Sequence, residues 1–379
     1  MTRGSLAVAL DATPLLGVRT GIGVFVHELV CALARPEGPA GIDLRAYAVT
    51  WRGRDELAGA LPAGVKPVRR PMPARPLREL WKRSDLAPLE LWTGPVDVVH
   101  GTNFVVPPAR RAARLVTVHD LTAWRFPDLV APASRDFPAL VGRAVRNGAW
   151  VHTNSQSVAD EVEDTIGAAP GRVRVVRPGV PPVTRGDPGT GRELAGTGRY
   201  VLALGTVEPR KDLPGLVAAF DQVASEDADV RLVVAGPDGW GTPAFEAAVA
   251  AAAHRDRVVR LGYVSEHERA GLLAGATVFA YPSVYEGFGF PPLEAMTAGT
   301  AVVATRAGAV PEVCGGAATL VDVGDVDALA AAMVRLLDDD DARAALVAAA
   351  RARAGEFSWA VCAAEMAALY DELRPSTSR

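Results

Sequence analysis

The chain has few of the residues that tie a fold together covalently or hold it around a metal. Among its 379 residues are 3 cysteines, Cys31, Cys314 and Cys362, which are far apart in the sequence and odd in number. The sequence contains no C-x2-C pair, so we expect neither a disulfide scaffold nor a zinc knuckle. We interpret Cys314 as a small apolar residue of a core.

Two further absences concern positive charge and long hydrophobic runs. Lysine and arginine number 40 against 44 aspartates and glutamates, so no global positive field would attract a nucleic acid. No apolar run reaches the roughly 20 residues of a membrane-spanning helix, and the N-terminal apolar stretch ends at Asp11 rather than at a signal-peptide cleavage site. We therefore expect a cytoplasmic protein that does not bind nucleic acid.

Hydrophobic residues make up 49% of the chain, and a chain of this length usually exceeds what one core accommodates. Short apolar runs alternate with helical patterns such as 21–34 and 157–166, which is typical of parallel strands covered by helices. The expected strands form two series, 6–10, 44–49, 96–100, 115–118, 150–153 and 173–176, then 200–204, 231–235, 258–261, 277–281, 301–305 and 319–321. Each series predicts a doubly wound, Rossmann-like α/β domain.

The segment between the two series has the composition of a linker. Residues 177–199 contain four prolines and six glycines and show little periodicity. We therefore place the domains at 1–180 and 198–357 and expect a central cleft between them. Near the second half of the chain, Ser265 and Glu268 form a predicted capping box, and Asp325 is expected to cap a helix rather than to bind a metal.

The most informative stretch holds two glutamates eight positions apart, Glu286 and Glu294. Between them, Gly287 and Gly289 would let the backbone approach a ligand closely. Pro291 then begins a predicted helix, and the amide groups of a helix start favour an anion such as a diphosphate. One carboxylate can face the hydroxyls of a sugar and the other those of a ribose, so the pattern predicts a nucleotide-sugar site.

This stretch resembles the donor-site signature of family 4 of the retaining glycosyltransferases, a Glu-x7-Glu pair around a Gly-Phe-Gly turn. Residues 205–213, 298–305 and 308–313 resemble the family as well, so the similarity covers nearly the whole chain. The resemblance implies the GT-B fold, with an N-terminal acceptor domain that the C-terminal helix 358–375 rejoins and a C-terminal donor domain. It also implies transfer of a sugar from a nucleotide-sugar to an acceptor hydroxyl.

The resemblance assigns roles to residues of both domains. Arg210 and Lys211 would neutralise the departing diphosphate, so no metal or other cofactor is expected. Many family members have an arginine where this chain has Thr206, and we assume that Arg210 replaces it. The implied catalytic residues are His119, Asp120, Arg210, Lys211 and Glu286. The implied donor-binding residues are Gly21, Gly23, Tyr263, Val264, Ser283, Phe288, Gly289, Phe290 and Glu294.

Several of these assignments have an ordinary structural alternative. The loop at Tyr263 and Val264 is equally a plain strand-to-helix connection, and Arg210 and Lys211 could be solvated surface charges. His119 follows a strand, where a histidine is as often structural as functional. Gly21 and Gly23 fit a turn that opens a helix, and they do not complete a dinucleotide-binding fingerprint because Val26 stands at the third glycine position.

The segment 66–83 is basic and carries Trp81. It could contact an anionic membrane, so that the protein would lie at the inner face of the plasma membrane, or it could be a proline-rich loop leading into a solvated helix.

For the reaction, our first expectation is mannose transfer from GDP-mannose to a glycan, lipid-linked or small-molecule acceptor. Two other classes stay open, a nucleotide-sugar 2-epimerase of the same fold and a catalytically silent nucleotide-sugar-binding protein.

Overall fold

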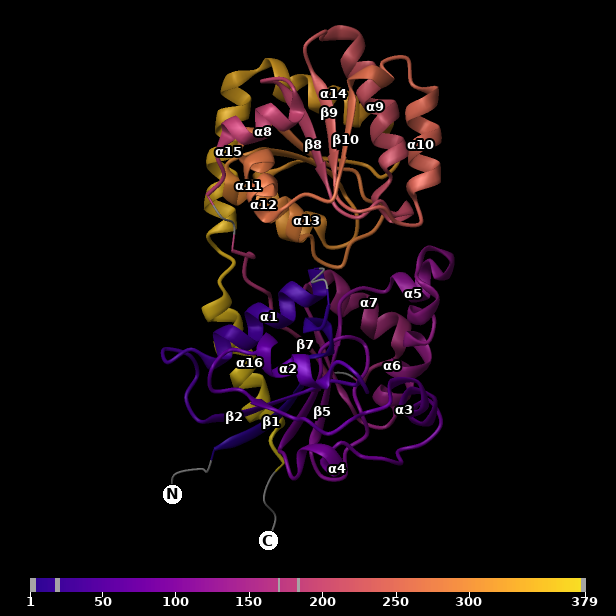
Figure 1. Ribbon diagram of the computed structural model, residues 1–379, viewed down its shortest axis with the longest axis vertical. Helices are drawn as coiled ribbons and strands as arrows, with labels where there is room; N and C mark the ends of the chain where they lie inside the picture. The colour runs from indigo at the N-terminus through magenta and orange to yellow at the C-terminus, as the bar shows by residue number, and fades with distance from the viewer. Residues whose placement is uncertain (1–4, 18–20, 170, 183–184, 376–379) are drawn as a thin grey trace. The chain divides into compact units, whose positions relative to one another are not determined.

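The computed structural model describes residues 5–17, 21–169, 171–182 and 185–375 (Figure 1). The chain divides into two units. Unit 1 extends to Pro181 and also contains the segment from Ser358 onward, and unit 2 is Pro182–Phe357. Each unit is built on its own parallel sheet.

The sheet of unit 1 has seven parallel strands in the order β3-β2-β1-β4-β5-β6-β7. The central strands β1, β4, β5 and β6 are mostly buried, because helices cover both faces of a doubly wound sheet, whereas β2, β3 and β7 are partly exposed. Chain order reverses between β1 and β4, so the loops after these two strands diverge at the edge where such folds bind ligands. The strands are β1 (Leu6–Asp11), β2 (Ile42–Tyr47), β3 (Lys66–Pro67), β4 (Val98–Gly101), β5 (Ala113–Val118), β6 (Trp150–Thr153) and β7 (Val173–Val175).

The last helix of the chain is part of unit 1. It packs against α1 and β1, and in Figure 1 it runs beside α1. The Trp359 indole donates a hydrogen bond of 2.8 Å to the carbonyl of Val180, and the Tyr370 hydroxyl lies 2.7 Å from Nδ1 of His100. The helices of unit 1 are α1 (Gly21–Ala34), α2 (Arg54–Ala60), α3 (Ala74–Trp81), α4 (Glu90–Thr93), α5 (Thr122–Arg125), α6 (Phe137–Arg146), α7 (Gln156–Ile166) and α16 (Trp359–Leu373).

The sheet of unit 2 has six parallel strands in the order β10-β9-β8-β11-β12-β13, and its chain order reverses between β8 and β11. Figure 1 shows α9 and α10 on one side of this sheet and α8, α11 and α12 on the other. The strands are β8 (Tyr200–Leu204), β9 (Arg231–Ala235), β10 (Val258–Gly262), β11 (Val278–Tyr281), β12 (Ala301–Thr305) and β13 (Thr319–Val321). The helices are α8 (Pro188–Ala195), α9 (Leu213–Glu226), α10 (Thr242–Ala251), α11 (Glu266–Gly275), α12 (Phe290–Ala298), α13 (Val310–Cys314), α14 (Val326–Asp338) and α15 (Asp340–Ala354).

The predicted fold class, two doubly wound Rossmann-like domains, is confirmed by these two sheets. Every expected strand is present with its ends within two residues of the prediction. The capping box is also confirmed, because the Ser265 hydroxyl accepts from the amide of Glu268 and the Glu268 carboxylate accepts from the amide of Ser265. Asp325 caps α14 as expected, through a hydrogen bond from the amide of Ala328.

The segment 177–199, predicted to be a linker with little periodicity, contains helix α8 in its second half. Asp187 caps this helix and Gly196 ends it in the left-handed conformation, so the local signals for a helix were present in the sequence. The helix contains glycine because it crosses α11 at close range. A side chain on Gly191 would collide with the backbone of Gly271 and with the Tyr200 hydroxyl.

Replacing Gly191 with alanine should therefore destabilise unit 2 by about 1–3 kcal/mol, because the added methyl group forces the two helices apart. Urea unfolding followed by circular dichroism would measure this change. Gly59→Ala is the matched control. Gly59 lies in α2 with open space around it, so this substitution should leave stability unchanged or raise it by roughly 0.5–1 kcal/mol. Equal effects of the two substitutions would contradict the close crossing.

Candidate functional site

The candidate site lies at the carboxyl edge of the sheet of unit 2, where the loops after β8 and β11 meet. These are the two strands between which the chain order reverses. The amide of Val284, after β11, donates a hydrogen bond of 2.9 Å to the carbonyl of Arg210, after β8. This backbone hydrogen bond fixes the loop that carries Arg210 and Lys211 against the loop that carries Glu286.

The carboxylate of Glu286 bridges both cations of the basic pair. Its Oε2 lies 2.5 Å from Nη1 of Arg210 and its Oε1 lies 2.6 Å from Nζ of Lys211. Lys211 also donates to the Tyr281 hydroxyl at 2.8 Å, and Arg210 donates to the carbonyl of Tyr285 at 3.0 Å. The sequence therefore placed these three charged residues correctly at one sheet edge, and the structure shows how they pair.

Burial alone would raise the pKa of Glu286, but the charges of Arg210 and Lys211 outweigh it and lower this pKa to about 2. Burial lowers the pKa of Lys211, and the charge of Glu286 opposes that change. Glu286 is accordingly an ionised carboxylate at neutral pH. It cannot act as a proton donor, and each of its two oxygens accepts a hydrogen bond from a cation and keeps a further lone pair.

Two glycines shape the backbone around Glu286. Gly289 caps α12 at φ +116°, a conformation that side-chain-bearing residues rarely adopt. Gly308, in the loop after β12, has φ +52°, and a side chain there would collide with the carbonyl of Glu286. That carbonyl accepts a hydrogen bond of 2.9 Å from the amide of Ala309. The loop after β12 therefore closes directly on the backbone of Glu286.

The start of α12 is a weaker anion site than the sequence argument assumed. The helix begins at Phe290, and Pro291 and Pro292 occupy its next two positions. Proline has no amide hydrogen, so two of the first three helical residues contribute no donor. An anion at this edge would therefore depend mainly on the positive charge of Arg210 and Lys211.

The other expected donor-site residues of unit 2 are placed as follows. Ser283 is fully buried beside the loop of Glu286. Phe288 packs its ring edge-on against Phe290 at 5.3 Å and against Phe357 at 5.8 Å, so this aromatic ring belongs to the packing beneath the turn. Tyr263, in contrast, is 74% exposed after β10, and Val264 beside it is half-buried.

Glu294 lies one helical turn into α12 and is buried. Its Oε2 pairs with the guanidinium of Arg269, which comes from α11. Burial raises the pKa of Glu294, and the charge of Arg269 acts in the opposite direction. The sequence analysis did not identify Arg269. Arg269 lies in the first turns of α11, after the Ser265 cap. This position indicates a contact with Glu294 only once it is known that α11 packs on α12.

In unit 1, His119 lies at the end of β5 and uses both ring nitrogens. Nε2 is 2.8 Å from the carbonyl of Thr102, and Nδ1 is 3.0 Å from the amide nitrogen of Asn154. A carbonyl can only accept, so Nε2 carries the hydrogen and Nδ1 accepts from Asn154. Burial lowers the pKa of His119, which agrees with this neutral form. His119 is therefore a positioned group with no nitrogen left to take a proton.

Two further histidines lie behind His119 in a buried network. Nε2 of His100 lies 2.7 Å from the Thr117 hydroxyl, which lies 2.9 Å from Nδ1 of His152. The ring of Phe25, from α1, stacks on His152 and meets His119 edge-on. Burial lowers the pKa of both His100 and His152, that of His152 to about 3.

Buried polar atoms around His119 lack hydrogen-bond partners among the described residues. They are Oδ1 of Asn103, Oγ1 of Thr122 and Oδ1 of Asn154, from the loops after β4, β5 and β6. Asp120 is occupied locally, because its carboxylate accepts the amide of Thr122 at 2.9 Å. Gly21 and Gly23 are the first and third residues of α1, whereas residues 18–20 of the same motif lie outside the described part of the chain. Each of these atoms could form a hydrogen bond with a hydroxyl group.

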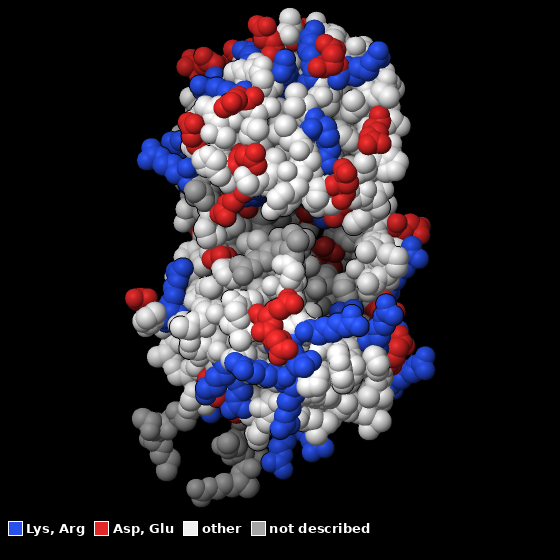
Figure 2. Space-filling view, viewed as in Figure 1, with Lys and Arg blue, Asp and Glu red and all other residues white. Residues whose placement is uncertain are grey.

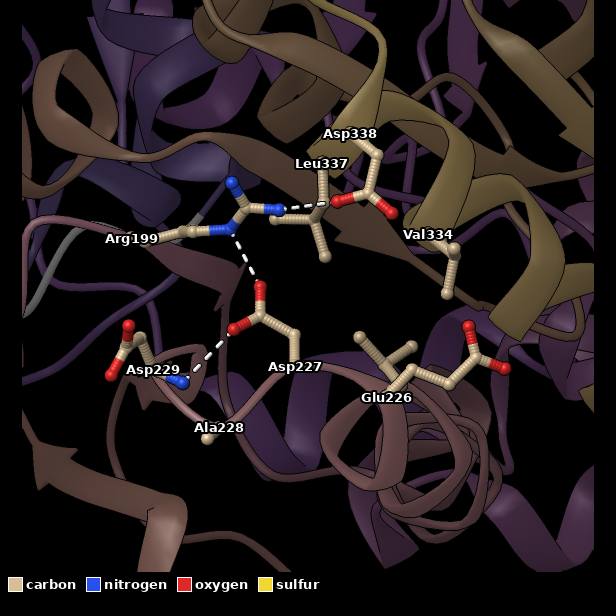
Figure 3. Close-up of a pocket in the computed structure, with 9 residues that line it drawn as sticks. Arg199, Glu226, Asp227, Ala228, Asp229, Val334, Leu337 and Asp338 are labelled. Atoms are coloured by element: carbon tan, nitrogen blue, oxygen red, sulfur yellow. Dashed lines mark hydrogen bonds and ion pairs between the residues drawn. The ribbon is translucent and has the colours of Figure 1, made fainter.

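A hollow lined by Arg199, Asp227 and Asp338 lies at the opposite edge of the sheet of unit 2. Figure 3 shows Arg199 pointing between Asp227 and Asp338, with Nε 2.7 Å from Asp227 and Nη2 2.5 Å from Asp338. Arg199 immediately precedes β8, so this hollow is at the amino ends of the strands. Doubly wound sheets bind their ligands at the carboxyl ends, so we do not assign this hollow to the site.

The basic segment 66–83 differs from the sequence expectation in one respect. Trp81 is 3% exposed and its indole donates to the carbonyl of Ala87, so this ring is not available to a membrane. Lys82 pairs with Glu79 and Asp136, while Arg69, Arg75 and Arg83 are exposed. Figure 2 shows lysine and arginine side chains grouped on the visible face of unit 1. None of the helices in the described ranges is both long and apolar enough to span a bilayer.

Known proteins share the fold over the entire chain. Sucrose-phosphate synthase from Thermosynechococcus elongatus has a TM-score of 0.74 with 21% identity, and the match covers 98% of this chain and 99% of that one. HepE from Anabaena, solved with UDP-glucose, has a TM-score of 0.71 with 17% identity over 97% and 100% of the two chains. The fold is thus the GT-B fold.

The sequence comparisons identify the family. Residues 19–183 match the model of glycosyltransferase family 4, and residues 198–339 match that of glycosyl transferases group 1. The chain belongs to the glycosyltransferase family whose two domains these models describe. It is 39% identical over 165 residues to O-antigen chain mannosyltransferase B of Escherichia coli, a match covering 43% of each chain. It is 35% identical over 193 residues to a phosphatidyl-myo-inositol mannosyltransferase of Mycolicibacterium smegmatis, covering 50% of this chain and 47% of that one. The chain thus spans about half the length of the curated relatives it matches.

The buried histidines predict that unit 1 loses stability in mild acid. Unfolded histidine binds a proton near pH 6.5, whereas folded His152 does so near pH 3. The neutral, buried His152 therefore costs no stability above pH 6.5. As the pH falls from there toward 3, it lowers the free energy of unfolding by about 1.4 kcal/mol per pH unit. Asp11 acts oppositely: burial raises its pKa to about 6, and the resulting cost disappears as the pH falls from there toward 3.8.

Urea unfolding of the protein and of His152→Gln between about pH 7 and pH 5 would test this. The free energy of unfolding of the variant should depend less steeply on pH, by about one proton. The variant Asp11→Asn should show the reverse change, a steeper loss of stability in acid. Identical slopes in all three proteins would contradict the assignment of neutral buried imidazoles.

Proposed function

We propose that this protein is a retaining, metal-independent glycosyltransferase that transfers a sugar from a nucleotide-sugar to an acceptor hydroxyl. The observation that carries the proposal is the ionised Glu286 carboxylate held by Arg210 and Lys211 at the switch point of the second sheet. Family membership defines the class of reaction. The arrangement of charges defines how this chain would perform it.

The donor diphosphate would bind at Arg210 and Lys211. As the glycosidic bond breaks, negative charge grows on the leaving phosphate, and two fixed cations stabilise that charge without a metal ion. Arg210 would take the place of the arginine that many family members have where this chain has Thr206. Glu286 would contact the hydroxyls of the transferred sugar, and Glu294 those of the ribose. Tyr263 and Val264 are the proposed contacts of the base.

The protonation states favour a reaction without a protein base or nucleophile. Glu286 is held by two cations, which makes its carboxylate a poor nucleophile, and His119 has no free ring nitrogen. The oxygen of the leaving phosphate remains as the acceptor for the proton of the attacking hydroxyl. Attack from the face that the diphosphate leaves would preserve the configuration of the sugar.

The acceptor would bind to unit 1 around His119. The unpaired oxygens of Asn103 and Asn154 can each accept a hydrogen bond from a hydroxyl, and the hydroxyl of Thr122 can donate or accept one. An unmade hydrogen bond at a buried atom costs about 1–3 kcal/mol, so an acceptor that supplied these partners would bind more tightly. A hydroxyl-rich acceptor, such as a glycan or a polyol headgroup, fits this chemistry.

Mannose from GDP-mannose is the proposed donor sugar. The support is the set of partial matches to proteins named as mannosyltransferases, which act on different acceptors. A thermal-shift panel of GDP-, UDP- and ADP-linked sugars at equal concentration would test the donor, since the ligand that binds the folded protein most tightly stabilises it most. We expect GDP-mannose to raise the melting temperature most.

Neutralising one cation tests the catalytic proposal. Lys211→Met should lower kcat by about 100-fold, because it removes one of two charges that stabilise the leaving group. Arg199→Gln, at the opposite edge of the same sheet, should retain activity. Product analysis by mass spectrometry should show sugar on the acceptor. Release of an epimerised nucleotide-sugar, or of no product at all, would refute the proposal.

We also propose peripheral contact with an anionic membrane through the exposed side chains of Arg69, Arg75, Arg83 and Leu86. Each cation near an anionic surface contributes about 1 kcal/mol. Exchange of all three for glutamine should abolish co-sedimentation with liposomes containing phosphatidylserine. The same exchange at Arg110, Arg111 and Arg146, which are also exposed in unit 1, is the control for net charge. Equal loss in both variants would count against a localised surface.

A further inference from the structure

A third cation, Arg269, lies beside the proposed donor site in unit 2. It comes from α11, the helix that follows the exposed loop at Tyr263, and its guanidinium pairs with Oε2 of Glu294 on α12. The side chain of Arg269 is 34% exposed, whereas that of Glu294 is 6% exposed. The buried carboxylate is therefore held from its solvent side by a partly exposed cation.

We infer that Arg269 is a positioning residue for the donor, which orients the Glu294 carboxylate toward the ribose of a nucleoside diphosphate. The inference rests on the proposed function. The contact engages one oxygen of Glu294, and within the described residues the other oxygen, Oε1, accepts no hydrogen bond. A carboxylate whose Oε2 is fixed in this way presents Oε1 in a single direction, which is what recognition of a hydroxyl pair requires.

The same contact opposes protonation of Glu294. Burial favours the protonated acid and raises its pKa, and the charge of Arg269 counteracts this. A protonated Glu294 would lose acceptor capacity toward the ribose hydroxyls. Arg269 would thus act twice on nucleotide binding, through the direction of the carboxylate and through its charge.

Isothermal titration with GDP, UDP and ADP as probes would measure the effect, using whichever the unaltered protein binds most tightly. Arg269→Gln should raise the dissociation constant about tenfold, the loss expected for one hydrogen bond to a charged group. Arg269→Lys, which keeps the charge, should recover part of the affinity. The lower limit of the pH range for binding should move upward in Arg269→Gln, because the charge that opposes protonation of Glu294 is removed.

A double-substitution cycle separates positioning from a purely structural role. If Arg269 acts through Glu294, then Arg269→Gln should have little further effect in a protein that already carries Glu294→Gln. Arg199→Gln is the matched control. Arg199 is 37% exposed and pairs with carboxylates of the same unit, but at the amino edge of the sheet, so its removal should leave nucleotide affinity unchanged.

The outcomes distinguish this inference from the proposed function. If the unaltered protein binds none of the three nucleotides, the proposed function fails and the role of Arg269 fails with it. If the unaltered protein binds nucleotide and Arg269→Gln binds it with the same affinity and pH dependence, only the inference is overturned. Fully additive effects of the two substitutions would also overturn it, because Arg269 would then act independently of Glu294.

Discussion

The arrangement of unit 2 depends on one buried ion pair, in which the carboxylate of Glu286 is shared by Arg210 and Lys211. Charges of both signs are removed from water here, and a buried charge without its partner would cost several kcal/mol. The surrounding structure is therefore constrained to keep all three groups together. The backbone hydrogen bond from Val284 to Arg210 and the close approach of Gly308 to Glu286 meet that constraint. These three side chains together carry a net positive charge of one, and a further carboxyl group, that of Glu208, lies 3.4 Å from Arg210.

The carboxyl edges of the two sheets present different chemical groups. In unit 2 the carboxyl edge gathers ionised groups, which suits a charged diphosphate. In unit 1 the corresponding edge holds His119 in a fixed tautomer, amide and hydroxyl oxygens that lack partners among the described residues, and the carboxyl groups of Asp11 and Asp120. Neutral acceptors suit hydroxyl groups. The cations Arg210 and Lys211 thus distinguish the proposed donor side, although both sides are built on the same type of sheet.

Much of the fold could be predicted because buried parallel strands leave continuous apolar runs, and these runs were located to within two residues. Helix α8 was missed because its prolines and glycines resemble a linker, whereas the glycine at 191 serves a close helix crossing that only α11 reveals. Trp81 was assigned to a surface because its neighbours are basic. Its burial depends on how α3 packs, which the local sequence does not specify.

The sequence by itself determined which chemical groups are available at each strand end, because strand period and glycine placement fix where a parallel strand stops and which residues follow it. It thereby determined that Arg210, Lys211, Glu286 and His119 lie at carboxyl edges. Only the tertiary structure decided their partners. Arg210 with Glu286, Arg269 with Glu294, and His119 with Asn154 join residues 25 to 76 positions apart, and such pairs form when separate loops and helices converge. Which residues pair depends on how close they lie in space, and the pairing sets the charge and the orientation of each side chain.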